Sequence, residues 1–107
     1  MHSIHALDEI ESRELIPGFK GKFLHTDSMT LVYWDIAAGA KLPEHSHFHE
    51  QVVNLLDGEF VLTIEGVRNE LKAGDVLVIS RNASHHGEAI TDCRILDVFQ
   101  PVREDYR

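Results

Sequence analysis

The amino-acid sequence predicts an all-β protein with a single domain. Three observations carry this prediction: short apolar segments recur roughly every 8–12 residues, glycine-containing turns separate them, and only residues 6–15 suit a helix. A chain of 107 residues has room for one hydrophobic core. We therefore expect one domain over residues 1–107, with an N-terminal arm and first strands at 1–28, a barrel at 29–101 and a C-terminal tail at 102–107.

The first half of the chain contains three predicted strands. Residues 29–37 are rich in β-branched and aromatic side chains, which favour strands. Residues 51–56 and 59–65 are apolar segments on either side of Asp57-Gly58, and an Asp-Gly pair in this position is typical of a β-hairpin. Side chains alternate along the second arm, so one of its faces should be buried. Residues 6–15 are expected to form either a short helix or an extended arm.

The second half continues with turns and strands. Glu65-Gly66 predicts the next turn, and residues 73–75, Ala-Gly-Asp, predict another. Residues 76–80 are a continuous apolar run, which is consistent with a strand buried on both faces. Residues 81–89 are expected to form a loop, and residues 94–99 the last strand.

Composition argues against several kinds of partner. The formal net charge is −8, with 18 acidic and 10 basic residues, and the basic residues form no cluster. Such a chain repels phosphate backbones and anionic membranes on average, so we expect neither a nucleic acid nor a membrane as partner. The sequence contains no signal-peptide pattern and no apolar run of membrane-spanning length. Its single cysteine, Cys93, is expected to be a buried, unreactive thiol in a cytoplasmic protein.

Histidines at alternate positions form the most unusual motif. His45 and His47 precede the strand that contains Gln51, and side chains at i, i+2 and i+6 of an extended segment point to one face. Imidazole nitrogens bind divalent transition metals, and such sites need three or four ligands. A further ligand is expected from His85 or His86, which follow the apolar run. The alternative is a solvated strand edge on which the histidines bind nothing.

Two motifs in this region resemble those of the cupin family. The first has a glycine, a His-x-His pair, an acidic or amide ligand and a second glycine, and its elements here are Gly39, His45, His47, Gln51 and Gly58. In the second motif a Gly-Asp pair precedes a strand, and a histidine follows eleven residues after the glycine, which leads from Gly74 to His85. The prolines usual in the second motif are replaced here, so this loop departs most from the family pattern.

The resemblance implies a fold, a metal ion and a subunit arrangement. Cupins fold as a double-stranded β-helix, a small jelly-roll barrel with one metal ion inside, and often form homodimers. The resemblance implies His45, His47, Gln51 and His85 as ligands of one divalent transition metal. Histidine and amide ligands suit zinc (Zn), nickel (Ni), iron (Fe) and manganese (Mn) alike, so the sequence does not identify the ion.

The amide of Gln51 has a chemical consequence. Many cupins have a glutamate at this place, which would cancel part of the charge of the metal, whereas three imidazoles and an amide leave the ion its full double positive charge. This favours an anionic ligand and Lewis-acid chemistry on an oxygen atom. In another register Glu50 would be the ligand, but strand alternation points it the other way. His49 and His86 are expected beside the site or on the surface.

The last predicted strand contains a carboxylate that can face in either direction. If Ile95, Asp97 and Phe99 face inward, Asp97 lies inside the barrel, where an unpaired charge is costly and must be either partnered or used. The opposite registry places Asp97 in water and needs no function. We expect the inward registry.

The end of the chain, Asp-Val-Phe-Gln-Pro-Val-Arg-Glu-Asp, resembles that of one cupin group that acts in pectin and alginate breakdown. Enzymes of that group open the ring of 4,5-unsaturated uronates to give linear keto sugars. The resemblance implies Asp97 as the acid/base group, Phe99 as a pocket wall and Arg103 as the residue that binds the sugar carboxylate. For Arg103, a salt bridge with Glu104 or Asp105 is an equal alternative.

The leading hypothesis is therefore a metal-dependent enzyme that acts on a small anionic sugar or acid by ring opening of 4,5-unsaturated uronates. The alternatives are a metal-dependent oxygenase, a cupin that binds a small molecule without catalysis, and a metal-free barrel in which the histidines are incidental.

Overall fold

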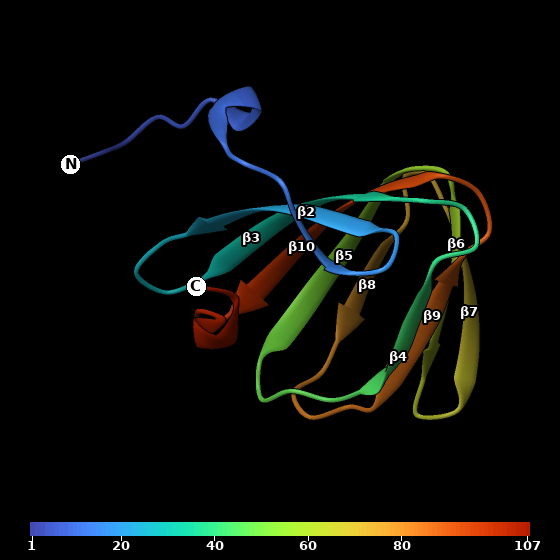
Figure 1. Ribbon diagram of the computed structural model, residues 1–107. Helices are drawn as coiled ribbons and strands as arrows, with labels where there is room; N and C mark the ends of the chain where they lie inside the picture. The colour runs from blue at the N-terminus through green and yellow to red at the C-terminus, as the bar shows by residue number, and fades with distance from the viewer.

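The computed structural model describes residues 1–107 as two antiparallel sheets that face each other (Figure 1). The larger sheet has six strands in the order β1-β2-β3-β10-β5-β8, and the smaller sheet has four in the order β4-β9-β6-β7. The elements are η1 (Leu7–Glu9), β1 (Arg13–Ile16), β2 (Phe19–His25), β3 (Thr30–Ile36), β4 (Lys41–His45), β5 (Glu50–Asp57), β6 (Glu59–Ile64), β7 (Val67–Lys72), β8 (Val76–Ile79), β9 (His85–Ala89), β10 (Cys93–Gln100) and η2 (Glu104–Tyr106), where η denotes a single 3₁₀ turn. The predicted all-β class and double-stranded β-helix are confirmed.

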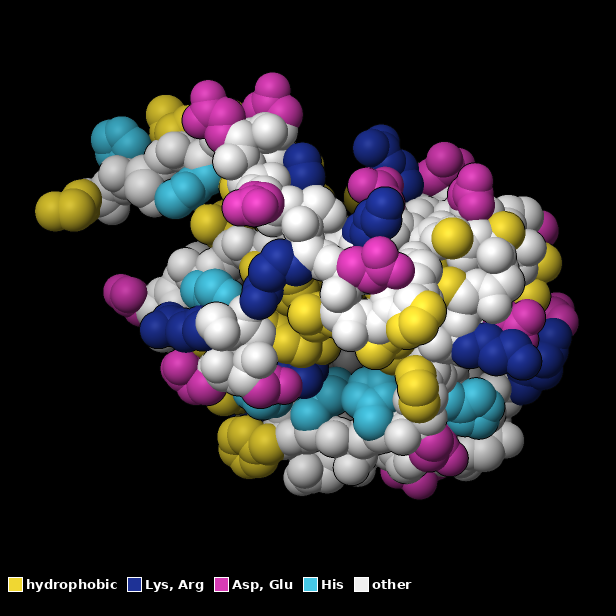
Figure 2. All heavy atoms as spheres, viewed as in Figure 1, with side chains coloured by type: hydrophobic (Ala, Val, Ile, Leu, Met, Phe, Trp, Pro, Cys, Tyr) yellow, Lys and Arg dark blue, Asp and Glu magenta, His cyan; other side chains and the backbone are white.

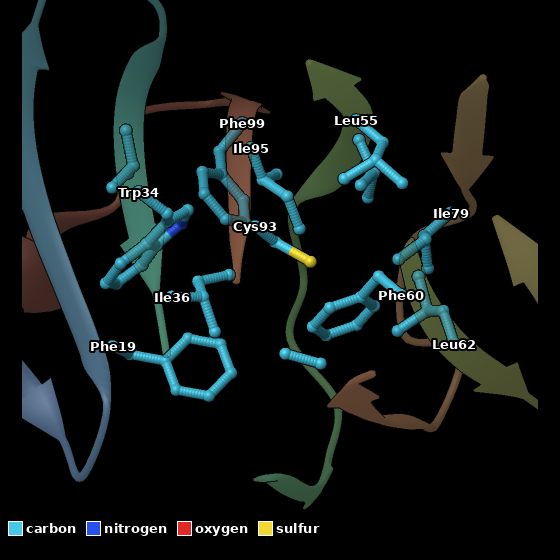
Figure 3. Packing of buried hydrophobic residues seen from close by; sticks show 13 residues of the cluster. Phe19, Trp34, Ile36, Leu55, Phe60, Leu62, Ile79, Cys93, Ile95 and Phe99 are labelled. Carbon is cyan, nitrogen blue, oxygen red and sulfur yellow. The ribbon is translucent and has the colours of Figure 1, made fainter. Parts of the chain in front are cut away.

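The hydrophobic core lies between the two sheets (Figure 3). The alternation of side chains along each strand directs one face inward, so β3 buries Trp34 and Ile36 on the same side as Phe19 of β2. Across the core they face Phe60 and Leu62 of β6, in the smaller sheet. Cys93, at the start of β10, is buried in this core as predicted, and burial raises the pKa of its thiol.

The predicted hairpin at Asp57-Gly58 is wrong. β5 pairs with β10 and β8, whereas β6 pairs with β7 and β9, so the chain crosses from one sheet to the other at this turn. Gly58 has a φ of 93°, and a β-carbon there would collide with the carbonyl oxygen of Asp92. The glycine signal correctly marks a tight turn. The glycine does not specify which strands pair, because pairing depends on how the apolar faces of the two sheets pack against each other.

The predicted turn at Glu65-Gly66 is confirmed. Ile64 of β6 pairs directly with Val67 of β7, and both turn residues have positive φ, 48° and 78°. Two positive φ values are what the tightest hairpin turns require, because their twist matches that of the flanking strands.

Two other expectations for the second half are wrong. β8 is an edge strand of the larger sheet, and Val76 and Val78 are 61% and 59% exposed, so this apolar run is not buried on both faces. Residues 85–89, expected within a loop, form β9, which lies between β4 and β6. A polar strand that contains Gly87 lacks the β-branched residues by which strands are predicted.

The N-terminal segment combines both options that the sequence left open. Residues 7–9 form the 3₁₀ turn η1, and the chain then enters β1 at the edge of the larger sheet, with the first residues extending away from the barrel (Figure 1). η2, at the other end of the chain, lies near the ends of β3 and β10 (Figure 1). None of the helical turns has the length or apolar character needed to cross a membrane.

Candidate metal and active site

Three histidines meet at one end of the barrel. His45 is the last residue of β4 and His85 the first residue of β9, and these two residues pair directly across the strands. His47 follows in the short connection to β5. The three residues each contribute a possible ligand atom, and these atoms all lie within 4.8 Å of one another. Three of the four predicted metal ligands are therefore in one cluster, and the fourth, Gln51, lies next to His47.

Backbone carbonyl groups determine which nitrogen of each imidazole carries a proton. In His45, His47 and His85 the Nδ1 atom lies 2.8, 2.9 and 2.9 Å from the carbonyl oxygen of a residue two positions away. Because a carbonyl oxygen only accepts hydrogen bonds, each Nδ1 is the donor and each neutral ring keeps a lone pair on Nε2. The Nε2 atom of His85 is buried and has no hydrogen-bond partner. This arrangement suits a cation.

The contact between His47 and Gln51 leads to the same conclusion. Nε2 of His47 lies 3.1 Å from Oε1 of Gln51, but the proton of the neutral ring is already used at Nδ1. A second proton is disfavoured, because burial and the charge of Arg103 lower the pKa of His47 to about 4. The amide N–H of Gln51 lowers the pKa of Asp97 by hydrogen bonding to its carboxylate. Rotating the amide by half a turn would offer an N–H to His47, but it would also turn the amide oxygen towards that carboxylate. A metal ion held by His45, His47, Gln51 and His85 would remove the conflict.

The loop before His85 is fixed without the prolines that are usual in cupins. Asn82, with a φ of 64°, donates its backbone N–H to the carbonyl oxygen of His47 at 2.8 Å, which links the two histidine-bearing segments. Glu65 in the β6–β7 turn binds Ser84 twice: its backbone N–H donates to the Ser84 carbonyl, and its Oε1 accepts from the Ser84 N–H, both at 2.8 Å. These hydrogen bonds thus hold the loop in the absence of prolines.

Three neighbouring residues lie outside the cluster. His49 has its Nε2 atom 3.1 Å from the carbonyl oxygen of Val102, and it is not part of the cluster that His45, His47 and His85 form. His86 is exposed and pairs with the carboxylate of Glu44 at 3.0 Å. Glu50 is exposed on the opposite side of β5 from Gln51. The alternative register, in which Glu50 takes the place of Gln51 beside the histidines, is therefore not the one that the chain adopts.

Asp97 faces into the barrel between Ile95 and Phe99, so the expected inward registry is confirmed. Its Oδ2 atom accepts a hydrogen bond of 2.9 Å from the indole Nε1–H of Trp34, while Oδ1 has no hydrogen-bond partner. Burial raises the pKa of Asp97 to about 6, although the Gln51 amide and the Trp34 indole act in the opposite direction. A carboxyl group with a pKa near neutrality is suited to both accept and return a proton.

Arg103 is buried, and its guanidinium lies against two aromatic rings, 4.8 Å from the centre of Phe99 and 4.1 Å from that of Tyr106. Its Nε and Nη2 atoms donate to the two carboxylate oxygens of Asp105 at 3.0 and 2.8 Å. This is the salt bridge that the sequence left open as an alternative. Nη1 remains buried without a partner, so Arg103 has one nitrogen free for a ligand.

One cavity of about 420 Å³ connects Asp97 and Arg103 with His45, and its volume is within the range of roughly 300–1,000 Å³ of small-molecule sites. Its polar wall contains His45, Gln51, Asp97 and Arg103, and 12 of its 18 lining residues are hydrophobic. In Figure 2, histidine side chains form a row beside a hollow, and hydrophobic side chains lie on the opposite side. The site therefore combines a charged end with apolar walls.

Sequence reasoning missed Trp34 and Tyr106. Trp34 is in a correctly predicted strand and shares the inward parity of Ile36, but its bond to Asp97 depends on the pairing of β3 with β10, in which Asp97 lies opposite Val32. Tyr106 lies in the short C-terminal turn η2, where the sequence has no periodicity to interpret.

A two-sheet antiparallel barrel with inward histidines and an amide at one end is the architecture of a cupin. The chain belongs to the cupin family, because the model of the cupin domain matches residues 32–99.

Individual relatives extend over nearly the whole chain. The pectin degradation protein KdgF of Dickeya dadantii (strain 3937) is 32% identical over 102 residues, which are 92% of this chain and 93% of that protein. The structure of KdgF from Halomonas sp. superimposes with a TM-score of 0.93 at 27% identity, covering 100% of both chains. An RmlC-like cupin from Shewanella frigidimarina NCIMB 400 also has a TM-score of 0.93 and 27% identity, covering 100% of this chain and 97% of the other.

Proposed function

We propose that this cupin opens the ring of 4,5-unsaturated uronates in a metal-dependent reaction. The observation that carries the proposal is the buried carboxylate of Asp97, whose Oδ1 has no partner, in the same cavity as Arg103, with its free Nη1, and His45, one residue of the histidine cluster. The similarity to a pectin degradation protein supports the substrate class, since pectin is a polymer of uronates.

The metal ion would be held by His45, His47, Gln51 and His85, and zinc, nickel, iron and manganese all suit this ligand set. When bound, it would supply Lewis-acid polarisation of a substrate oxygen. Because all four ligands are neutral, the charge of the ion would favour an anionic substrate.

Asp97 would move the protons of the reaction. The substrate ring is closed by a hemiacetal, so opening it breaks the bond between C1 and the ring oxygen, removes the proton of the C1 hydroxyl and leaves an aldehyde. The released ring oxygen is an enol attached to the C4=C5 double bond, and protonation at C4 converts this enol into a ketone. The substrate and the product are isomers, so one group that accepts a proton and returns it is sufficient.

Arg103 and Phe99 would orient the substrate. The free Nη1 of Arg103 would donate to the substrate carboxylate, because its other two nitrogens are already bound to Asp105. Phe99 would form the adjoining wall, since its ring lines the cavity and contacts both His47 and Arg103.

The test combines metal analysis with an assay. Protein purified without a histidine tag is expected to contain a divalent metal and to accelerate the loss of absorbance of an unsaturated uronate above its spontaneous rate. Asp97→Asn is expected to lower the rate by about 10²-fold or more, as loss of a general acid/base group does. A variant as active as wild type would rule out the role of Asp97, and oxygen consumption with the substrate would favour the oxygenase alternative.

We also propose that residues 1–107 act as one domain within a homodimer. The outer face of the larger sheet supports this proposal: Leu56, Val76 and Val78 are 55–61% exposed there, on the neighbouring strands β5 and β8. Val52, which faces the same way, pairs with both Val78 and Val98, so the apolar surface continues across three strands. A continuous exposed apolar patch of this kind is typical of a protein–protein interface.

A further inference from the structure

Two opposite charges face the same cavity without pairing with each other. Asp97 is 8% exposed and its Oδ1 has no partner, while Arg103 is 6% exposed and its Nη1 has no partner. A buried carboxylate and a buried guanidinium attract each other strongly and ordinarily form a salt bridge. These two do not, so other contacts must hold them apart.

Each charged group is fixed from its other side. Asp105 binds Nε and Nη2 of Arg103 with both carboxylate oxygens, which determines the orientation of the guanidinium. Asp97 accepts a hydrogen bond of 2.9 Å from the indole of Trp34 at Oδ2, and the Gln51 amide also acts on this carboxylate. The position of Oδ2 therefore depends on the indole donor.

The indole ring itself has little freedom to move. Phe19 and Phe23 contact it edge-on, with ring centres 5.9 and 5.6 Å from that of Trp34. On neighbouring β2, Gly21 leaves space for the ring, since a β-carbon there would lie 2.7 Å from the nearest indole carbon. A donor held by three residues of the neighbouring strand fixes its acceptor more firmly than a flexible side chain would.

We propose that Trp34 is the positioning residue of the active site: its indole N–H anchors Oδ2 of Asp97, so that Oδ1 remains directed into the cavity and does not pair with Arg103. This inference rests on the proposed function, because it assigns Trp34 its effect through the carboxylate that moves the protons. It keeps both Asp97 and Arg103 available to the substrate.

The test removes the N–H donor and preserves the ring. In Trp34→Phe the ring is smaller, whereas benzothienylalanine at position 34 has sulfur in place of the N–H and keeps the shape of the indole. Both variants are expected to lower kcat about 10- to 100-fold, the factor that corresponds to losing a hydrogen bond to a charged group. Bound metal should change by less than about twofold, because the donor contacts none of the proposed metal ligands. KM should rise, because an Asp97 carboxylate that pairs with Nη1 of Arg103 competes with the substrate carboxylate for that nitrogen.

Phe23→Leu is the matched control. Phe23 packs on the same indole and on Tyr106 but offers no hydrogen-bond donor to Asp97, so this variant is expected to lower the melting temperature and leave kcat within about twofold of wild type. An equal loss of kcat in Phe23→Leu and in the benzothienylalanine variant would overturn the inference.

A double-mutant cycle separates positioning from general damage. If Trp34 acts through Asp97, Trp34→Phe combined with Asp97→Asn is no slower than Asp97→Asn alone, whereas independent effects multiply and would overturn the inference. If wild type opens no unsaturated uronate, the proposed function fails, and crystal structures then decide the role of Trp34. An Asp97 carboxylate turned towards Arg103 in the benzothienylalanine variant supports the inference, and an unchanged carboxylate contradicts it.

Discussion

At the scale of single residues, the site places an amide where a carboxylate would bind a metal ion equally well. Gln51 has its oxygen 3.1 Å from Nε2 of His47, and its amide lowers the pKa of the neighbouring Asp97. A glutamate at this position would keep an oxygen ligand, but it would lose the N–H donor and bring a second negative charge to Asp97. The neutral side chain thus suits both the proposed metal site and the buried carboxylate.

Gln51→Glu is therefore expected to retain the metal and to bind anionic substrates more weakly. The added charge repels the substrate carboxylate in a partly buried site, so KM should rise roughly 10-fold or more. Metal analysis and steady-state kinetics measure the two effects. Gln100→Glu, which adds the same charge at an exposed position, is the control, and an unchanged KM in Gln51→Glu would count against this account.

Asp97 also makes the stability of the metal-free protein depend on pH. Its pKa is raised to about 6 from an ordinary value of 3.8, so between these values the folded protein holds a proton that the unfolded chain has lost. The free energy of unfolding contributed by Asp97 therefore falls as pH rises from about 4 to 6 and is constant above that range. Asp97→Asn removes this penalty, which amounts to roughly 3 kcal/mol.

Urea unfolding with a chelator, at several pH values from 4 to 7, measures this effect. The pKa values of His47 and His85 are lowered by burial, so these two residues destabilise the folded protein in acid. They do so in wild type and in Asp97→Asn alike, so the difference between the two proteins isolates Asp97. The stability gain of the variant should grow from pH 4 to 6; a gain independent of pH would be inconsistent with a raised pKa.

At the scale of elements, the loop before β9 determines where His85 lies. Glu65→Ala removes the Oε1 acceptor of the Ser84 N–H but keeps a β-carbon, so the strain of the positive φ at this turn is unchanged. Losing this hydrogen bond is expected to cost about 1 kcal/mol, which corresponds to roughly fivefold weaker metal binding. Competition with a coloured chelator measures the affinity.

Glu70→Ala, which breaks only an exposed ion pair with Arg68, should bind metal as wild type does; equal weakening in both variants would refute the role of the loop.

The same elements explain which features were predictable from sequence. Strands such as β3 and β10 are predictable, because buried and less buried side chains alternate along them and this alternation is a local property of the sequence. The histidine spacing also located the cluster of His45, His47 and His85. Strand pairing was not predictable, because Gly58 marks a turn whether the chain returns to its own sheet or crosses to the other. For the same reason the bond between Trp34 and Asp97 became visible only in the folded structure.

At the scale of the whole molecule, the outer face of the larger sheet has no covering layer. The smaller sheet covers only the inner face of the larger one, and Val76 and Val78 on the outer face are 61% and 59% exposed. Apolar strands at a sheet edge associate readily unless charges or bulges oppose it. A second copy of this chain would bury this surface by presenting the same apolar face, as a two-fold symmetric dimer does.

Val78→Asp is expected to convert the proposed dimer into a monomer. The substitution places a charge within the apolar surface, where a symmetric dimer would bury it twice, and each buried unpaired charge costs several kcal/mol. Sedimentation velocity measures the change in mass, and circular dichroism shows whether the fold is retained. Val67→Asp is the matched control, because Val67 is 62% exposed but lies on β7 in the smaller sheet. Val67→Asp should remain a dimer; a wild-type protein that sediments as a single chain, or equal dissociation of both variants, would show that the outer face of the larger sheet is not the interface.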